Sequence, residues 1–521
     1  MSDLIIPSRR RLIRAAAGLA AASIAPPALV SAALAQPRLT DDPFSLGVAS
    51  GEPTPDGMVL WTRLAPRPLD PDGGLPPEAL PVGWELAEDE GFKRIVAKGR
   101  ALARPELGHS VHVEPAGLEP AREYFYRFSF SGALSPVGRT RTAPAPGAPV
   151  DRLRYAFGSC QKYESGHYGA YAHLVADAPD LVFFLGDYIY EGDPKTSGVV
   201  RSHKNPEPKD LAGYRVRYAT YKSDPLLQAA HACAPWLVTW DDHEVANDYG
   251  ADRDQDFGDP WAFLQRRAAA YQAYYEHMPL RAAQMPVGPA MLLHRTLDWG
   301  NLAQFQIVDD RQYRDARPCL GPEAGRGKAI PDCDERRAAT RSHLGRVQEA
   351  WLLDELSASR ARWNVLAQQT LFESARRIDS QGRPFYSADG WENAPANRER
   401  IVRRWAEAKV SNPFVIGGDI HTFAAGDVRA APGEPVVATE YVGGSVTSLG
   451  GTAESDRRTA EQNPDLGLFN SVVRGYGLVD LTPGHAQVAF RAVEDATDPK
   501  TGVGDLARFV IESGRAGLQR A

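Results

Sequence analysis

The sequence has no excess of basic residues. It contains 59 Lys and Arg against 66 Asp and Glu, which gives a formal net charge of −7 over 521 residues. Nucleic-acid-binding proteins usually carry a basic face, so this balance argues against that class. Internal repeats and low-complexity tracts are also absent, and 43% hydrophobic with 24% charged residues is typical of a globular protein. The length exceeds one ordinary core and predicts two domains.

Long apolar stretches are scarce except near the N-terminus. There, Ser8-Arg9-Arg10-Arg11 precedes an Ala-rich run that ends at Ala33-Leu34-Ala35, which has the small-x-small form of a signal-peptidase site. We interpret residues 1–35 as a twin-arginine signal peptide. This predicts the twin-arginine export machinery as a partner and a periplasmic or extracellular location. Pro26-Pro27 interrupts the run, so an uncleaved anchor is the weaker interpretation and no permanent membrane span is expected.

Cysteine is rare, with four residues in the chain. In an exported protein they suggest a disulfide, and Cys319 and Cys333 flank a loop dense in Gly, Pro and charge. We favour that pair, whose closure contributes about 3 kcal/mol in the chain-entropy model. Cys233 is interpreted as a buried small hydrophobic residue. Cys160 follows the apolar run "LRYAF" and is a candidate metal ligand.

The pattern of apolar residues changes once along the chain. Residues 41–142 contain short alternating stretches separated by turn residues, which predict a small antiparallel β-sandwich domain. Residues 143–150 form a Pro- and Ala-rich linker. Residues 151–521 alternate apolar strands with helical stretches, which is typical of an α/β domain.

Five apolar strands of the second region end in polar residues of similar kinds. "LRYAF" leads to Cys160, "LVFFL" to Asp187 and Tyr190, "PWLVTW" to Asp242, His243 and Asn247, "FQIV" to Arg311, and "PFVI" to Asp419 and His421. In layered α/β sheets, the loops beyond the carboxyl ends of the strands meet at one edge. We therefore expect these side chains to form one site.

The residue types at these strand ends are those of metal ligands. The two oxygens of Asp187 can bridge two cations, and Tyr190 can return to the same ion. A shell of thiolate, phenolate and carboxylate is anionic and suits ferric iron better than zinc. Oxygen donors such as the Asn247 amide suit calcium or magnesium. Taken singly, an Asp after a strand is more often a helix cap and a buried Cys is more often structural. Five such clusters in one domain favour the metal site.

The motifs together resemble a known family. "FGSCQ", "GDYIYE", "TWDDHEVAND", "VDDRQYRD" and "GGDIHTFAAGD" occur in the order found in the PhoD family of alkaline phosphatases and phosphodiesterases. "FSLGVASGEPTPDGMVLWTRL" is similar to the leading sandwich module of that family. The resemblance implies an α/β fold, in which a calcineurin-like, two-sheet α-β-β-α metallophosphoesterase core follows the small antiparallel β-sandwich.

The resemblance also implies a ligand set. It assigns Fe3+ to Cys160, Asp187, Tyr190 and Asp419, shares Asp187 with Ca2+, and adds Asp242 and Asn247 as further ligands. His243 and His421 occupy motif positions expected near the phosphate or the metals. Two positions depart from the family pattern, because Asp248 stands where a second Asn is usual and Asp310 where Thr is common. Both departures add negative charge and leave substrate and metal preference open.

The function predicted from these residues is hydrolysis of phosphate mono- or diesters by metal-assisted in-line attack. In this mechanism His243 protonates the leaving alkoxide and Arg311 pairs with a phosphate oxygen. Alternatives are a phospholipase D-like phosphodiesterase of the same family and a non-catalytic phosphate- or metal-binding protein. A nucleophilic Cys160 is disfavoured because "GSCQKYESG" lacks the arginine that activates such a thiolate. We expect a monomer that acts on a phosphate ester.

The C-terminal residues carry a sparse apolar pattern. Asp505 can cap a helix, and Leu506, Phe509 and Val510 then share one face. We predict a terminal helix after Gly504. The family resemblance suggests that such a helix covers the mouth of the site as a lid, whereas terminal helices more often simply dock on the surface.

Overall fold

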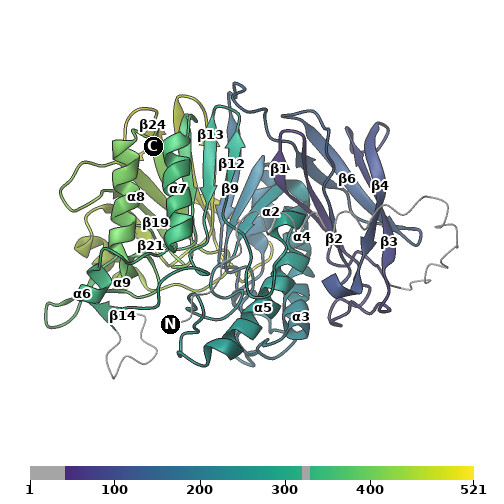
Figure 1. Cartoon of the computed structure of the whole chain (residues 1–521), viewed down its shortest axis with the longest axis horizontal. Coiled ribbons are helices and arrows are strands. Elements are labelled where there is room, and N and C mark those ends of the chain that lie inside the picture. The colour runs from purple at the N-terminus through teal and green to yellow at the C-terminus, as the bar shows by residue number, and fades with distance from the viewer. Residues whose placement is uncertain (1–40, 320–328) are drawn as a thin grey trace. The chain divides into compact units, whose positions relative to one another are not determined.

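The computed structural model describes residues 41–319 and 329–521, so the predicted signal peptide lies outside the described residues. Among the described residues, no helix is both long and apolar enough to cross a bilayer. Within these two described ranges the strands form four sheets, and the helices lie on the outer faces of the two largest (Figure 1). The predicted strand-rich start and the alternating α/β remainder are both present.

The largest sheet has ten strands and combines both regions of the chain. In spatial order its strands are β25 (Gln519–Arg520), β24 (Val503–Glu512), β23 (His485–Val493), β22 (Arg474–Leu481), β9 (Leu153–Gly158), β10 (Leu181–Leu185), β11 (Pro235–Thr239), β1 (Val48–Thr54), β2 (Gly57–Arg63) and β5 (Ser110–Val113). Strands β9, β10, β11 and β1 are parallel neighbours, so their carboxyl ends lie at one edge.

A second sheet of seven strands faces the first. Its order is β12 (Arg295–Trp299), β13 (Ala303–Ile307), β15 (Trp363–Ala367), β18 (Pro413–Gly417), β20 (Ala438–Gly443), β19 (Phe423–Val428) and β21 (Leu466–Asn470). Aromatic and branched side chains of both sheets, among them Phe157, Phe183, Phe305 and Ile416, form one buried core between them. The central strands β10, β11 and β15 are buried along their whole length because helices cover the opposite side.

The helices complete the predicted α-β-β-α layers. On the ten-stranded sheet lie α2 (Gly169–Ala176), α3 (Leu211–Lys222), α4 (Pro225–Cys233) and α5 (Pro260–His277). On the seven-stranded sheet lie α7 (Arg346–Ala358) and α8 (Pro395–Glu407), with α6 (Asp334–Arg337) and α9 (Ala453–Gln462) nearby in Figure 1. Asp210, Asp224 and Asp259 cap α3, α4 and α5 and fix where these helices begin.

The strands of residues 41–142 divide between two sheets. An antiparallel sheet contains β4 (Ile95–Ala103), β3 (Leu80–Ala87), β6 (Glu123–Phe130), β7 (Ala133–Leu134) and β8 (Gly138–Arg141). The others, β1, β2 and β5, continue the core sheet because β1 pairs in parallel with β11. The boundary at residues 143–150 stays a prediction.

A small three-stranded sheet lies apart from the others. It consists of β14 (Ala329–Pro331), β17 (Pro384–Ser387) and β16 (Arg377–Ile378). The predicted disulfide joins Cys319 to Cys333 just before α6, with Cα atoms 6.2 Å apart, and is confirmed. Cys160 and Cys233 are free thiols, and Cys160 is fully buried.

The predicted C-terminal helix is wrong, because Val503–Glu512 is strand β24. Phe509 and Ile511 alternate into the core between the sheets and are 0% and 4% exposed. Leu506 is the extra residue of a β-bulge, since Asp505 pairs with Arg491 and Ala507 with Phe490. The bulge shifts the alternation by one residue, so Leu506 and Phe509 fall three apart and imitate helical spacing. Because this segment is a strand of the core sheet, the helix that the lid hypothesis requires is not formed by these residues.

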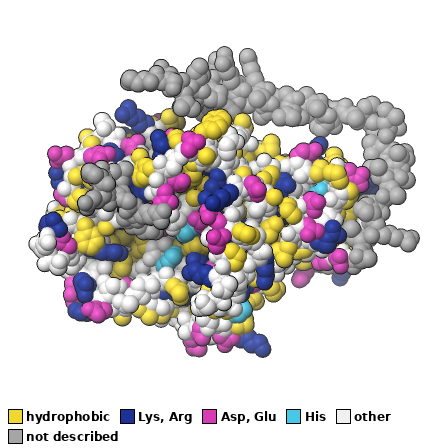
Figure 2. Space-filling model, turned by 90° about the horizontal axis from the view of Figure 1, so that it is seen from below, with side chains coloured by type: hydrophobic (Ala, Val, Ile, Leu, Met, Phe, Trp, Pro, Cys, Tyr) yellow, Lys and Arg dark blue, Asp and Glu magenta, His cyan; other side chains and the backbone are white. Residues whose placement is uncertain are grey.

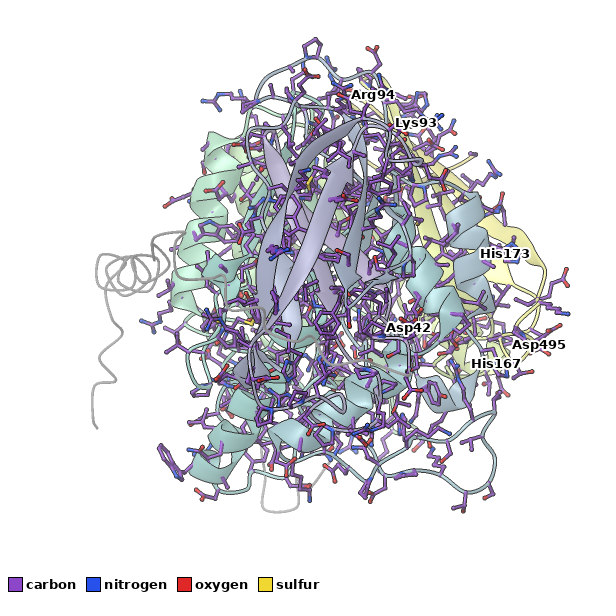
Figure 3. The ribbon with its side chains drawn as sticks, turned by 90° about the vertical axis from the view of Figure 1, so that its right-hand side faces the viewer. Asp42, Lys93, Arg94, His167, His173 and Asp495 are labelled. Atoms are coloured by element: carbon purple, nitrogen blue, oxygen red, sulfur yellow. A yellow bond between two sulfur atoms is a disulfide. The ribbon has the colours of Figure 1, made fainter. Side chains whose placement is uncertain are left out.

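The segment before β24 is fixed against α2. The His173 ring donates from Nε2 to the carbonyl oxygen of Thr501 over 2.7 Å. The backbone N–H of His167 donates to the carbonyl oxygen of Ala496 over 2.8 Å, on the side of the molecule seen in Figure 3. The C-terminal strands thus belong to the core sheet.

Candidate metal centre

The predicted site residues meet at the carboxyl ends of the strands. Cys160, Asp187 and Asp242 follow β9, β10 and β11 of one sheet, and Asp419 follows β18 of the other. Their ligand atoms form four groups in which all atoms lie within 4.8 Å of one another: Cys160, Asp187 and His421; Asp187, Asp242 and His243; Asp241, Asp242 and Asp419; Asp242, Asp248 and Asp389. Asp187 and Asp242 link the groups into one continuous cluster.

The backbone is bent sharply at several of these residues. The φ angles of Cys160, Asp187, Asp248, Asp419 and His421 are 59°, 57°, 54°, 60° and 53°. L-residues adopt this left-handed region at a cost of about 1 kcal/mol or more, and such residues gather at functional sites. At Cys160, Asp187 and Asp419 the bend comes two residues after the end of strand β9, β10 or β18, where the chain turns into the site.

Glu244 holds two of the loops together. Its buried carboxylate accepts hydrogen bonds from the backbone N–H groups of Asp187 and Asp241 over 3.1 and 2.8 Å, and it also accepts from Tyr188. The loops after β10 and β11 are thereby fixed to each other. Glu244 is a structural partner of the cluster and has no place in its ligand set.

The thiol side of the cluster fits a highly charged cation. The Tyr190 hydroxyl donates to Asp187 Oδ2 over 2.7 Å and accepts from Ser448 Oγ over 2.7 Å. Burial, with Asp187 adding to it, raises the pKa values of the Cys160 thiol and the Tyr190 phenol well above their ordinary range. Among the described residues, the buried Oδ1 of Asp187 accepts no hydrogen bond. A cation at this point would satisfy that oxygen and favour both anions.

The carboxylate side offers hard oxygen donors. Asp242 Oδ2 accepts from the backbone N–H of Asp248 over 2.6 Å, which places both carboxylates beside Asp389. Asn247 lies in the same loop, and its side-chain amide donates to Gln255 Oε1 over 2.8 Å. This donor set is the kind that calcium prefers. Of the two family departures, Asp248 therefore lies within the cluster.

The other departure, Asp310, is turned away from the cluster. Asp310 Oδ2 accepts from the backbone N–H of Gln369 over 3.1 Å and lies 3.8 Å from His343 Nε2. The Asp310 backbone N–H donates to Gln369 Oε1 over 2.6 Å. The Asp310 carboxylate therefore lies beside Gln369 and His343 and is not a member of the four ligand groups.

Arg311 lies wholly inside the acidic cluster, with 0% exposure. Its guanidinium donates to both oxygens of Asp389 over 2.6 and 3.0 Å and to Asp241 through Nε. One terminal nitrogen is also 3.5 Å from Asp242. Burial opposes its charge, but the surrounding carboxylates raise the pKa of Arg311 overall. Its present partners are carboxylates, and the predicted contact with phosphate stays a prediction.

Both predicted histidines belong to the cluster, and each is held through its Nδ1 atom. His243 Nδ1 donates to Glu191 Oε2 over 2.6 Å, and His421 Nδ1 donates to the carbonyl oxygen of Leu449 over 2.8 Å. An acceptor at Nδ1 fixes the proton there and leaves Nε2 for a ligand or substrate. Burial disfavours the charged ring, but Glu191, Asp242 and Asp187 outweigh it and raise the pKa of His243.

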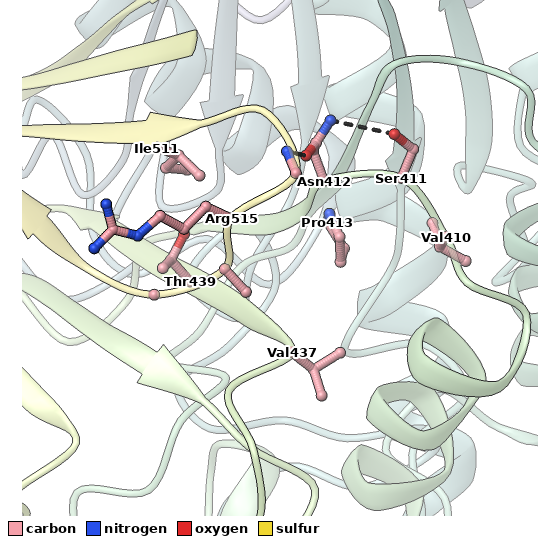
Figure 4. Close-up of a pocket in the computed structure, with 11 residues that line it drawn as sticks. Val410, Ser411, Asn412, Pro413, Val437, Thr439, Ile511 and Arg515 are labelled. Carbon is pink, nitrogen blue, oxygen red and sulfur yellow. Dashed lines mark hydrogen bonds between the residues drawn. The ribbon is translucent and has the colours of Figure 1, made fainter. Parts of the chain in front are cut away.

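A pocket of about 640 Å³ opens beside the cluster and includes Asp389, Asp419 and His421 in its wall. Figure 2 shows histidine side chains within a hollow on this face. A smaller pocket of about 250 Å³, drawn in Figure 4, lies where β18 begins, at Pro413, with Ile511 and Arg515 beside it. It is at the opposite end of β18 from Asp419 and has no carboxylate or histidine in its lining. Only the larger pocket reaches the candidate metal centre.

Several residues of the site were missed from the sequence. Glu191 and Glu244 stand inside the quoted motifs "GDYIYE" and "DDHE", and Asp241 precedes the predicted ligand Asp242. Their position within or beside these motifs was the feature of the sequence that could have indicated a role in the site. Ser448 comes five residues after strand β20, the same distance at which Tyr190 follows β10, and Asp389 comes two residues after the short strand β17, but no role was predicted for either residue.

Comparisons with known proteins match most of the chain. The family model described as "PhoD-like phosphatase" matches residues 155–490, and "PhoD-like phosphatase, N-terminal domain" matches residues 29–144. Alkaline phosphatase D of Bacillus subtilis (strain 168) is 45% identical over 496 residues, which cover 93% of this chain and 84% of that protein. A solved structure described as "Structure of PhoD" has a TM-score of 0.88 at 44% identity and covers 93% of each chain.

Proposed function

This chain belongs to the PhoD-like phosphatase family and is a phosphoric ester hydrolase, and we propose that it hydrolyses mono- and diesters at the strand-end cluster. The observation that carries the proposal is the buried Asp187 Oδ1, which accepts no hydrogen bond among the described residues. The Asp187 carboxylate lies where Cys160, Tyr190, His421 and Asp242 converge. Such an arrangement is costly unless a cation binds there.

The proposed ligands divide by their chemistry. Cys160, Asp187, Tyr190 and Asp419 would hold Fe3+, and Asp187, Asp242 and Asn247 would hold Ca2+ together with Asp248. When bound, these cations polarise the phosphoryl oxygens and lower the pKa of coordinated water. The assignment of iron rests on the thiol and the phenol, which calcium and magnesium sites do not use.

The chain's own groups supply the proton and the orientation. Glu191 holds the ring of His243 through Nδ1, which leaves Nε2 as the ring atom that can act on a substrate beside Asp187 and Asp242. From this position His243 would protonate the leaving alkoxide of the ester. His421, held by the Leu449 carbonyl, lies 3.0 Å from the Tyr190 hydroxyl and would orient the substrate or its ligands. Arg311 holds the carboxylates of Asp241 and Asp389 in place.

The geometry does not support a nucleophilic Cys160. A reactive thiolate needs a lowered pKa and an accessible sulfur, whereas this thiol is buried and its pKa is raised by burial and by Asp187. Its hydrogen bond to Ser159 Oγ, 3.2 Å long, is also that of a donor thiol. We therefore assign Cys160 to metal binding.

Purified protein tests the proposal through phosphate release. We expect turnover of p-nitrophenyl phosphate or bis-p-nitrophenyl phosphate that chelators abolish and added iron and calcium restore. His243→Gln should retain the metals but lose most turnover, because it removes only the proton donor. A metal-loaded wild type without turnover of either ester would favour the binding-protein alternative.

We also propose that the chain is exported by the twin-arginine pathway. The test is whether residues 1–35 are present on the precursor and absent from the periplasmic protein.

A further inference from the structure

The pocket beside the metal centre has walls from three separate parts of the chain. The small sheet β14-β17-β16 forms one wall, helix α9 forms another, and the loop after β18 joins them to Asp419 and His421. At about 640 Å³ the pocket falls in the range of sites that enclose a drug-sized ligand. A phosphate group by itself would leave most of this space unfilled.

The outer wall is fixed in place. Gln462 at the end of α9 accepts a hydrogen bond from the backbone N–H of Ile378 over 3.1 Å. Asn463 donates to the carbonyl oxygen of Arg376 over 2.9 Å. On the other strand, the Tyr386 ring lies 3.5 Å from the Arg336 guanidinium, a cation–π contact. The pocket is therefore formed before any substrate arrives, which lowers the entropic cost of binding.

The surface of the pocket is largely apolar. Leu371, Ile378, Phe385, Ile420 and Phe469 contribute to the lining, and Ile378 remains 42% exposed. Isolated exposed apolar side chains are ordinary, but five that line one concave surface next to a reaction centre indicate contact with an apolar group.

The charged side chains of the pocket differ in whether they are paired with a close partner. Glu373 is paired with Arg398, and Glu392 accepts hydrogen bonds from Ser374 and from the backbone of Ser387 over 2.5 and 2.8 Å. Arg377 also lines the pocket, and within the described part of the chain its side chain makes no ion pair or hydrogen bond. The acids are thus engaged by close partners, and the second cation of the lining, Arg458, is paired with Glu454. Arg377 has no such close partner, although its charge acts on nearby Glu392 and favours the charged form of that carboxyl.

We propose that this pocket binds the organic group of the ester and that Arg377 selects organic groups carrying a negative charge of their own. The inference rests on the proposed phosphoesterase function and names its substrate class: esters whose organic part combines an apolar body with a second anionic group. The reacting phosphoryl group would lie at the metal cluster, the apolar body along Phe385 and Phe469, and the second anion at Arg377.

Two monoesters that differ only in this second charge test the proposal. We would measure kcat/KM for phenyl phosphate and 4-carboxyphenyl phosphate in the metal-loaded wild type, Arg377→Ala and Arg377→Gln. We expect both variants to lower the carboxyphenyl-to-phenyl ratio by about fivefold, the upper range for an exposed ion pair. Phe385→Ala should lower kcat/KM for both aryl esters while leaving ethyl phosphate unchanged.

Arg383→Ala is the matched control, because Arg383 lies in the same β16–β17 hairpin, pairs with Asp379 and is absent from the pocket lining. It should leave the ratio at the wild-type value. An unchanged ratio in both Arg377 variants, with activity on phenyl phosphate intact, would overturn the subsite and spare the phosphoesterase function. A wild type inactive on all three esters would overturn both.

Discussion

Asp242 is shared between ligand groups on the two sides of the metal centre. It belongs to three of the four ligand groups, and its Oδ2 fixes the loop that carries Asp248. Asp187 has the same role toward the thiol side, where it meets Cys160 and His421. A site with two such shared carboxylates is suited to more than one cation, since each carboxylate has two oxygens.

Asp248→Asn tests whether the additional carboxylate strengthens the hard-metal side. Because calcium affinity follows the charge count of the ligands, we expect about a tenfold rise in the calcium Kd, measured by titration calorimetry on metal-depleted protein. Asp310→Asn is the control, since Asp310 faces Gln369 and His343 and lies outside the ligand groups. Equal effects of the two substitutions would contradict the placement of Asp248 as a ligand.

Glu191→Gln tests how His243 keeps its proton. Glu191 raises the pKa of His243, and a general acid is active only below its pKa. Loss of the carboxylate should therefore move the alkaline limb of the kcat/KM profile to lower pH, measured with p-nitrophenyl phosphate. Glu164→Gln provides a control at another buried Glu–His pair, whose atoms are 3.7 Å apart at His203. If the limb stays where it is in Glu191→Gln, His243 is not the proton donor.

At the level of elements, the strands that carry ligands were predictable and the C-terminal strand was not. The runs ending at Leu185, Thr239 and Gly417 are short, mostly apolar and followed by polar residues, so each pattern matches its strand. β24 was misjudged because its bulge at Leu506 breaks the alternation that identifies a strand. The pairing of β1 with β11 was also invisible, since neither sequence encodes its partner.

Strand β24 should determine stability and should not regulate access. Phe509 is buried between the two large sheets, so Phe509→Ala should lower the free energy of unfolding by about 3–5 kcal/mol, measured by urea denaturation. Truncation after Thr501 should give aggregated or unfolded chain, because it exposes the long edge of β23. Arg515→Ala, at an exposed position, should leave stability unchanged. A folded truncation with raised diesterase activity would restore the lid hypothesis.

For the whole molecule, a buried lysine links stability to pH. Lys222 lies over the Trp61 ring at 4.2 Å, and burial lowers its pKa to about 7. The unfolded chain binds this proton up to a pH of about 10.4, so between these values the unfolded state holds more protons and stability rises with pH. Lys222→Met should therefore raise Tm at pH 7 and reduce the gain in Tm between pH 7 and pH 9.5.

The exposed Lys98→Met serves as the comparison for that experiment, because it removes the same charge from the surface of β4. It should reproduce the wild-type pH dependence of Tm. An identical pH dependence of Tm in the wild type and Lys222→Met would contradict this account, because it would mean that folding does not lower the pKa of Lys222.

The metal content of the purified chain tests the central claim most directly. Elemental analysis and the visible spectrum should be recorded together with phosphatase activity for the wild type, Cys160→Ser and Cys233→Ser. We expect stoichiometric iron, calcium and a phenolate-to-iron absorption band in the wild type. Cys233→Ser should retain all three, because the native Cys233 lies outside the cluster. Cys160→Ser should lose iron, colour and activity together. A colourless, fully active wild type containing only zinc, or an inactive Cys160→Ser with full iron, would contradict the account.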